Sequence, residues 1–538
     1  MPRGTRGRSQ AEGAEDDAAV VGSSEAVDEK VVLSKCANGM IPMLFTLALL
    51  AYLDRTNISF AANDLRNDTG IGDAEYGLGS SAFFVGYATL QLPSMLGARY
   101  FGAPCWLAVI MSLWGVVAAL FAALCCHRSE DVTLAGFYIL RFLLGALESG
   151  AFPSMYYYLA LVFEADELTL YYPRVTISTA IAGVIGGVIA AGLLALDGVG
   201  GLRGWQWVFI AEGTWTLAFA PLVMCVLPRD PSRAKWLTPA ESEWLTRRRA
   251  TAIAEAARHV PPARTSTEEP SPGGSSAGPA RGSARGWARG WARGWAHLLT
   301  AQTPPMRALR NWRTWYCGAI WALQCTAYYG IVFWMPMLIG QMVPAASTPV
   351  VALITAIPYS CASAAMLSNA WHSKRTSERR WHCAIPLLVC GVSLGLAPLA
   401  ARLSTAVALL LLCAATSGAF CTYGPFFSWP AVWAGAGAEA ACSVSIINSL
   451  GNVGGMVGPA LVGMLSQVEG AVEASEHIHA LIVLGSTALV AGLMAAVFQP
   501  VATREQQQWC CLTVFSTPLL HLHSAERSDE VVEQREGA

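Results

Sequence analysis

Five ionisable side chains fall inside stretches of sequence that are otherwise apolar, and these are the residues that could do chemistry. They are Asp54, Arg55, Arg141, Glu148 and Glu212. Because an ionised side chain at the centre of a bilayer costs about 3 kcal/mol or more, such residues usually face one another or a water-filled cavity. A carboxylate there can take up a proton, and an arginine can hold another carboxylate through two parallel hydrogen bonds. The residue types therefore predict proton and anion binding at one cavity.

The spacing of these residues limits which of them can face the same partner. Arg141 and Glu148 are seven positions apart, so on a helix they share a face and lie about 10 Å apart along the axis. Asp54 and Arg55 are adjacent and point about 100° apart, so at most one of them addresses a single partner. We predict that Asp54 and Glu148 couple proton movement and that Arg55 and Arg141 bind the anion. The alternative is two ion pairs that only hold two spans together. For Glu212 we expect a gate or a structural ion pair.

The second half of the chain has uncharged polar residues inside its apolar stretches. We predict that Gln324, Tyr328, Asn448 and Asn452 complete the substrate site. Asn448 and Asn452 are four positions apart, so they share a helix face. The alternative for the asparagines is interhelical hydrogen bonding beside glycines that permit close packing.

The composition shows what kind of molecule must position these residues. Hydrophobic residues make up 54% of the 538 positions and charged residues 13%, about half of the roughly 25% usual in soluble proteins. The charges concentrate in residues 1–36, 229–313 and 500–538. So little polar surface excludes a soluble enzyme, and the net charge of −2 argues against nucleic-acid binding. The sequence indicates a polytopic membrane protein.

Twelve apolar stretches are long enough to cross a bilayer, which takes about 20 residues each. They lie near 37–62, 76–98, 104–126, 132–161, 171–196, 205–228, 314–338, 349–371, 382–401, 405–430, 439–467 and 478–499. Six stretches, a polar loop and six more stretches indicate two halves, as in transporters built from internal repeats.

The distribution of basic residues predicts the orientation. The loop after the eighth stretch carries Lys374, Arg375, Arg379 and Arg380, whereas the odd-numbered connections are rich in acids. Both termini are therefore expected in the cytoplasm. The predicted segments are a disordered cytoplasmic tail (1–36), a first six-helix half (37–228), a cytoplasmic central loop (229–313), a second six-helix half (314–499) and a cytoplasmic C-terminal tail (500–538).

Other function classes lack the residues that they need. The histidines lie in loops or at span ends, and no Cys/His cluster has the spacing of metal ligands, so we expect no enzyme, no metal and no cofactor. No filter repeat or ring of charges predicts a channel. Lipidation of Cys510 and Cys511 and glycosylation of Asn67 stay open.

Several motifs, in this order and spacing, resemble the major facilitator superfamily and, within it, the anion:cation symporter family of tartrate, nicotinate, phthalate and allantoate permeases. The resemblance covers about 35–245 and 307–500. Its motifs are Tyr52–Ile58, Arg141–Pro153, Gly204–Gly213, Trp236–Glu241, Phe333–Pro336, Arg379–His382 and Ile447–Gly455.

The resemblance implies an all-α fold of twelve transmembrane helices in two six-helix bundles around a central cavity, which works by alternating access. It also implies proton- or sodium-coupled uptake of a small organic anion, by a monomer in the lipid bilayer. In related proteins the residues that correspond to Asp54, Arg55, Arg141 and Glu148 handle proton and substrate, which agrees with the charge argument. We expect the plasma membrane rather than an internal membrane.

Two loops depart from the superfamily pattern. The segment Leu96–Cys105 keeps Arg99 but lacks the usual Asp, and it has Pro104 and Cys105 in place of a basic pair. Lys374 stands where an Asp is common. In the superfamily both loops latch the cytoplasmic gate, which makes Arg99, Lys374 and Arg375 expected gate residues. Glu212, near the start of the sixth apolar stretch, is the fourth expected gate residue. A uniporter, an exchanger, a sodium-coupled carrier and a non-transporting sensor stay open as alternatives.

Overall fold

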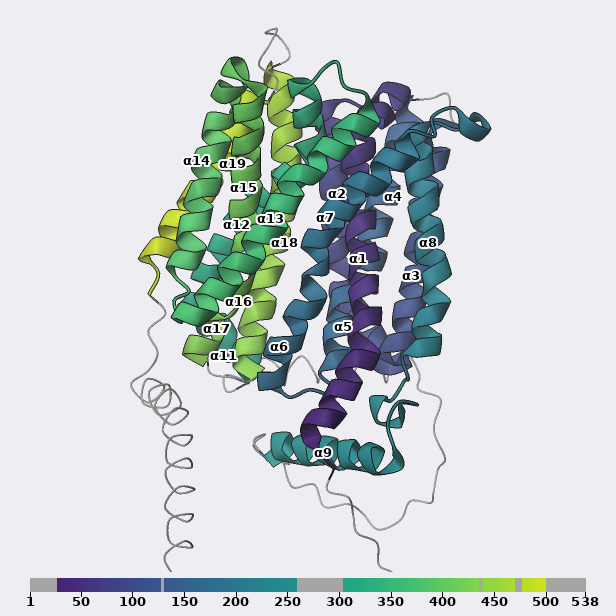
Figure 1. Ribbon diagram of the computed structural model, residues 1–538, viewed down its shortest axis with the longest axis vertical. Helices are drawn as coiled ribbons and strands as arrows, with labels where there is room; N and C mark the ends of the chain where they lie inside the picture. The colour runs from purple at the N-terminus through teal and green to yellow at the C-terminus, as the bar shows by residue number, and fades with distance from the viewer. Residues whose placement is uncertain (1–26, 127–129, 259–302, 435–437, 470–476, 500–538) are drawn as a thin grey trace, which may run out of the picture.

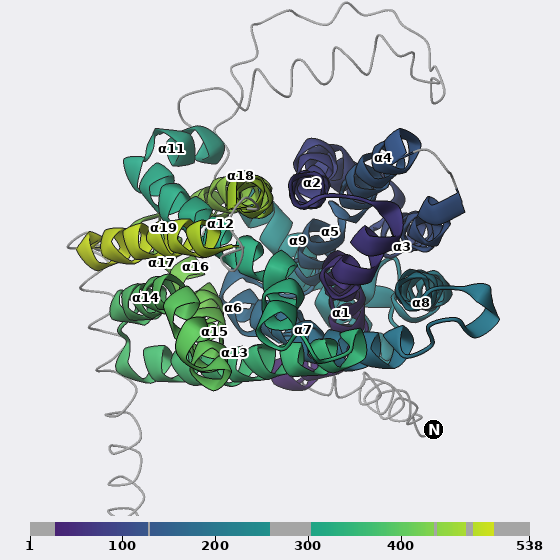
Figure 2. The same ribbon diagram turned by 90° about the horizontal axis from the view of Figure 1, so that it is seen from above.

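The computed structural model describes residues 27–126, 130–258, 303–434, 438–469 and 477–499. These residues form helices and connections, with no strand among them, so the expected all-α class is confirmed. Figure 1 shows the helices gathered into two bundles that stand side by side, and Figure 2 shows the same arrangement from above.

The N-terminal bundle holds the first eight α-helices. Their bounds are α1 Glu29–Thr69, α2 Asp73–Phe101, α3 Ala103–Leu120, α4 Glu130–Glu148, α5 Ala151–Leu159, α6 Ala165–Thr176, α7 Ser178–Leu194 and α8 Gly204–Val226. Short 3-10 helices cover Phe121–Cys126, Val199–Gly201 and Pro231–Arg233. A further helix, α9 (Pro239–Arg258), crosses the foot of this bundle in Figure 1.

The C-terminal bundle holds the remaining helices. They are α11 Pro304–Arg310, α12 Trp312–Met342, α13 Thr348–Thr376, α14 Trp381–Leu403, α15 Thr405–Cys421, α16 Tyr423–Phe427, α17 Trp429–Ala434, α18 Ala438–Glu469 and α19 Ile478–Val497.

Eleven helical segments of the described chain are long and apolar enough to cross a membrane, against the twelve predicted. The difference is α2, which is of sufficient length but mixes its leucines and valines with glycine and serine. Three predicted spans are single apolar segments made of shorter helices, namely Asp131–Leu159, Tyr171–Leu194 and Thr405–Ala434.

The first helix begins earlier than predicted, inside the expected tail 1–36. The Asp28 side chain accepts a hydrogen bond from the Lys30 N–H at 2.9 Å, which caps α1 at its start. The extra turns lie against α9, where Lys35 forms an ion pair of 2.7 Å with Glu241. Residues 29–36 are therefore helix. Of the described residues in the predicted tail, only 27 and 28 precede the helix. The C-terminal tail 500–538 lies outside the described residues.

The two bundles meet from the middle of the molecule to the end opposite α9. There α2 packs on α18 and α7 packs on α13. The Thr348 hydroxyl donates to Asp64 at 3.0 Å, and the Tyr76 hydroxyl donates to the Phe333 carbonyl at 3.1 Å. Both contacts join the N-terminal bundle to the C-terminal one, so the bundles are fastened together at this end.

Candidate functional site

The predicted charged residues come together in the interior of the N-terminal bundle. Asp54 and Arg55 on α1 are 1% and 5% exposed, and Arg141 and Glu148 on α4 are fully buried. Arg55 forms an ion pair with Glu148, which ends α4. One ion pair, as the alternative interpretation of these residues allowed, therefore joins α1 to α4.

Aromatic rings from both bundles surround the Arg55 guanidinium. Its carbon lies 5.0 Å from the ring centres of Tyr52 and Phe83 and 5.1 Å from that of Tyr87. One of its N–H groups also donates to the Tyr329 hydroxyl at 3.4 Å. The rings provide favourable cation–π contacts, worth about 0.5–2 kcal/mol each, so Arg55 is held firmly even apart from Glu148.

Arg141 has no such ionic partner. None of its three guanidinium nitrogens has a hydrogen-bond acceptor among the described residues. Its carbon lies 5.1 Å from the ring centre of Phe83 and 5.4 Å from that of Phe333, which belongs to α12 of the other bundle. A buried guanidinium with five donors and no acceptor is costly. Arg141 is thus the group best prepared to receive an anion.

Close helix packing explains how the two arginines come to share one ring. Gly145 lies one turn after Arg141 on α4, and a Cβ at this position would overlap the backbone oxygen of Phe83. Only a residue without a side chain lets α4 approach α2 so closely. The Phe83 ring then lies beside both guanidinium groups.

Asp54 faces away from both arginines. Its Oδ2 accepts hydrogen bonds from Trp114 Nε1 of α3 at 2.9 Å and from the Thr216 hydroxyl of α8 at 2.8 Å. Its Oδ1 has no partner among the described residues. Asp54 is therefore a separate buried carboxyl group, fixed by neutral donors.

Glu212 lies in the interior of α8, one turn before Thr216, and is 3% exposed. Asp54 is an electrostatic neighbour of Glu212, and Glu212 Oε2 has no partner among the described residues. The structure thus places Glu212 near the Asp54 carboxyl, inside the helix bundle.

The predicted residues of the second half have mixed surroundings. Tyr328 reaches the charged cluster because its hydroxyl lies 3.3 Å from that of Tyr52, across the two bundles. Gln324 donates to the Ala419 carbonyl at 2.9 Å, so its amide N–H belongs to packing against α15. Asn452 is buried and Asn448 is exposed. The structure therefore brings Tyr328 to the cluster, directs the Gln324 N–H to the α15 backbone and leaves Asn448 exposed.

Several neighbours of the charged groups did not emerge from the sequence. Phe83 and Tyr87 resemble ordinary packing residues in an apolar stretch. Phe333 belongs to the Phe333–Pro336 motif but was not predicted as a site residue. Tyr329 is adjacent to the predicted residue Tyr328, and this adjacency is the one feature of the sequence that could have suggested it.

Three of the four predicted gate residues lie at the α9 end of the molecule. Arg99 is exposed at the end of α2. Lys374 and Arg375 are exposed at the end of α13, where Arg375 stacks over Trp371 at 5.3 Å. None of these three cations has an ion-pair partner among the described residues.

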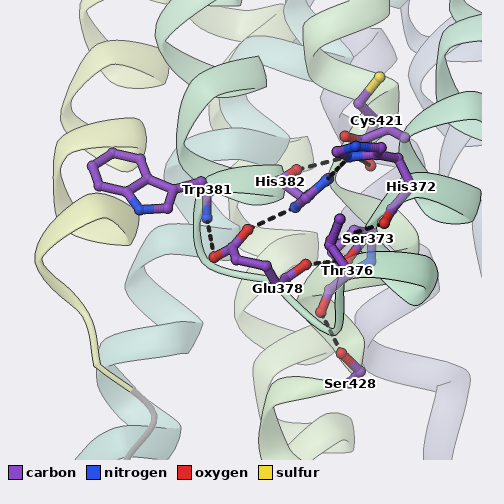
Figure 3. Close-up of polar contacts among 10 residues, drawn as sticks. His372, Ser373, Thr376, Glu378, Trp381, His382, Cys421 and Ser428 are labelled. Atoms are coloured by element: carbon purple, nitrogen blue, oxygen red, sulfur yellow. Dashed lines mark hydrogen bonds and ion pairs between the residues drawn. The ribbon is translucent and has the colours of Figure 1, made fainter.

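The connection from α13 to α14 is held by a chain of side chains (Figure 3). His382 Nδ1 lies 2.6 Å from Glu378 Oε2, and its Nε2 lies 2.7 Å from His372 Nδ1. One arrangement of protons satisfies the chain, with His382 donating to Glu378 and accepting from His372. Partial burial alone would raise the pKa of Glu378, but hydrogen bonds from the Trp381 N–H and from His382 outweigh it and lower the pKa.

No group of three or more His, Cys, Asp or Glu side chains in the described part of the chain could hold a metal ion.

Comparison with known proteins shows what this arrangement belongs to. Residues 44–459 match the Major Facilitator Superfamily. A putative tartrate transporter of Agrobacterium vitis is 31% identical over 480 residues, which cover 89% of this chain and 95% of the relative. The putative metabolite transport protein NicT of Pseudomonas putida is 30% identical, with 87% of this chain and 95% of the relative covered.

The fold is similar to that of a solved transporter. The xylose transporter XylE of E. coli, in a partially occluded inward-open conformation, gives a TM-score of 0.61 at 13% identity, over 86% of this chain and 100% of that one. These proteins are transporters and not enzymes, and the eleven apolar helical segments fit a multi-pass membrane protein. The chain therefore belongs to the major facilitator superfamily, in agreement with its resemblance to the anion:cation symporters.

Proposed function

We propose that this transporter moves a small organic anion with a carboxylate group, coupled to protons, by alternating access. The observation that carries the proposal is Arg141, a fully buried guanidinium that has no acceptor among the described residues. A transported carboxylate would supply the missing acceptor through two parallel hydrogen bonds.

The position of Arg141 supports transport rather than static binding. Its ring neighbours are Phe83 of the N-terminal bundle and Phe333 of the C-terminal bundle. An anion bound there lies where the two bundles meet, so a change in their relative position alters its access. Substrate sites at such interfaces near the middle of the membrane are usual for secondary transporters.

The Arg55–Glu148 ion pair supports coupling to protons. Protonation of Glu148 would remove the charge that holds Arg55 and leave a second cation for the anion. Proton binding and anion binding would then favour each other, because each restores the charge balance that the other disturbs. Asp54, with its unpartnered Oδ1, offers a second site for a proton, and we reassign Glu212 to this site instead of a gate.

The orientation and the state of the molecule follow from the same proposal. The basic residues near the α9 end predict that this end faces the cytoplasm. Because the bundles are fastened at the opposite end, the structure corresponds to an inward-facing state. We propose the plasma membrane as the location and a monomer as the working unit.

The names of the relatives support a carboxylate as the substrate class. Names of relatives include a putative tartrate transporter and a putative metabolite transport protein, and tartrate is a dicarboxylate. A carboxylate group of such a substrate could accept two parallel hydrogen bonds from the buried guanidinium of Arg141.

Uptake into proteoliposomes tests the proposal. A panel of labelled mono- and dicarboxylates would be offered with and without an inward proton gradient, to wild type and to Glu148→Gln. We expect one anion class to accumulate with the gradient, and Glu148→Gln to transport it without dependence on the gradient. Uptake that depends on a sodium gradient and not on a proton gradient would indicate sodium coupling. Equal uptake with no gradient would indicate uniport or exchange, and no uptake of any anion by folded protein would favour a sensor.

A further inference from the structure

A basic cavity lies at the α9 end of the N-terminal bundle, separate from the buried charge cluster. Its volume is about 530 Å³. Arg99 comes from the end of α2, Arg229 and Arg233 follow α8, and Arg249 belongs to α9; Asp230 is the acidic residue of the lining. Three chain segments thus bring four arginines to one place.

The lining of the cavity has more arginines than acidic residues, so it carries a net positive charge. Asp230 accepts a hydrogen bond from Arg249 at 2.6 Å and one from the Ser232 hydroxyl at 2.9 Å. Partial burial would raise the pKa of Asp230, but these contacts outweigh it and lower the pKa, so Asp230 is ionised at neutral pH and balances Arg249. No acidic side chain of the described residues forms an ion pair with Arg99, Arg229 or Arg233. Three guanidinium groups therefore repel one another across the cavity.

The backbone on either side of the Arg229 side chain has two defined contacts. Gly102 has a φ of +89°, and a Cβ there would lie 3.0 Å from Cγ of Arg229. Glycine is thus needed both for this conformation and for the passage of the Arg229 side chain. The Tyr158 hydroxyl donates to the Pro228 carbonyl at 2.7 Å, which anchors the residue before Arg229. The side chains of Arg99, Arg229 and Arg233 line the same cavity and are exposed, so a ligand can reach them.

The surroundings place the cavity at the level of lipid headgroups. Tyr100 and Phe101, next to Arg99, are 68% and 48% exposed. Phe101 stacks on Trp106 with ring centres 5.7 Å apart. Met224, in the last turn of α8 and five residues before Arg229, is 54% exposed. Exposed aromatic residues at the end of a transmembrane helix are typical of the membrane–water interface.

We infer that this cavity binds phosphate groups, and that its ligand is an anionic compound with more than one phosphate. The guanidinium fork matches phosphate oxygens, and two or three forks in one cavity favour a ligand of high negative charge over a single weak anion. The interfacial position favours a lipid headgroup, and a free polyphosphate offers the same chemistry. The inference does not depend on the transported substrate.

Binding to the purified full-length protein in nanodiscs tests this site. The probes are phosphatidylinositol bisphosphate at a few per cent in phosphatidylcholine, phosphatidylserine at equal total charge, and soluble inositol hexakisphosphate. We expect the bisphosphate lipid to bind, and the triple variant Arg99→Gln, Arg229→Gln, Arg233→Gln to weaken binding at least about tenfold. Phosphatidylserine should bind more weakly, because it offers one phosphate per headgroup.

The matched control removes three positive charges elsewhere, through Arg310→Gln, Arg313→Gln and Arg402→Gln, and should leave binding unchanged. If the first triple variant does not fold, Arg229→Lys keeps the charge, loses the fork and should weaken binding severalfold. Tight binding of the soluble probe alone would identify a free phosphate compound as the ligand. Equal weakening by the control, or no binding of any probe, would overturn the inference.

Discussion

The two bundles of this transporter differ in the polar chemistry that their helices carry. The N-terminal bundle buries two arginines and three carboxyl groups, Asp54, Arg55, Arg141, Glu148 and Glu212. In the C-terminal bundle the described buried polar residues of the spans are uncharged, as in Gln324 and Asn452. Its ion pairs among the described residues lie at helix ends, as between Arg307 and Glu439. This asymmetry supports the proposal that proton and anion binding belong to the N-terminal bundle, while the C-terminal bundle contributes uncharged polar and aromatic side chains.

The largest expected effect comes from removing the unpartnered cation. Arg141→Met should lower uptake of the identified anion at least about 100-fold, since lost charged contacts of this kind cost about 2–5 kcal/mol. The same variant should have an equal or higher melting temperature, because it removes a buried charge with no acceptor among the described residues. Uptake into proteoliposomes measures the effect on transport, and thermal unfolding in detergent measures the effect on stability. A large loss of stability would show that Arg141 has a structural partner instead.

The next effect comes from breaking the ion pair of the same bundle. Arg55→Gln leaves Glu148 without its partner and should destabilise the protein by about 3–5 kcal/mol. The double variant with Glu148→Gln should recover much of that loss, because neither charge then remains unpaired. Denaturation of the two single variants and the double variant gives the coupling free energy. Additive losses would mean that the pair has no energetic importance.

A smaller effect is expected in the neutral bundle. Tyr328→Phe removes the hydroxyl that meets Tyr52 across the bundles and should change transport by about tenfold or less, the value of one neutral hydrogen bond. Initial rates of uptake over a range of substrate concentrations provide the measurement. A loss as large as that of Arg141→Met would remove the asymmetry between the bundles.

The smallest effect concerns the surface ion contacts of the C-terminal bundle. The pKa of Glu378 is lowered in the folded protein, so its stabilisation is present above the unfolded pKa of about 4.3 and is lost as the pH falls through the folded value. Because Glu378 is partly exposed, the contribution should be under about 1 kcal/mol. Melting temperatures between pH 3 and pH 6 should fall less steeply for Glu378→Gln than for wild type. Identical pH profiles would contradict the role of this contact.

The sequence predicted which charged residues lie buried inside the N-terminal bundle, but it did not predict which of them contact one another. An ionisable residue in an apolar stretch is conspicuous by itself, which is why Asp54, Arg55, Arg141 and Glu148 could be named. Which of them meet depends on how separate helices rotate and approach. Asp54 finds Trp114 and Thr216 instead of an arginine, and single-sequence patterns contain no information on such contacts.

The fold shows the same division. Apolar length predicted the positions of the spans, and α2 departs because its small and polar residues lower its hydropathy. The early start of α1 depends on the Asp28 cap and on packing against α9, which the charged composition of this region concealed. Phe83 meets both arginines because Gly145 permits the approach of α4, a contact that depends on tertiary packing.

One comparison tests the central claim, that Arg141 receives the transported anion, most directly. Gradient-driven uptake of the identified carboxylate would be measured for Arg141→Gln and for Gln324→Leu, at matched amounts of folded protein in the membrane. The account predicts that Arg141→Gln abolishes uptake while Gln324→Leu keeps it within about tenfold of wild type, since Gln324 donates to the α15 backbone. Normal uptake by Arg141→Gln, or its loss only in Gln324→Leu, would contradict the account.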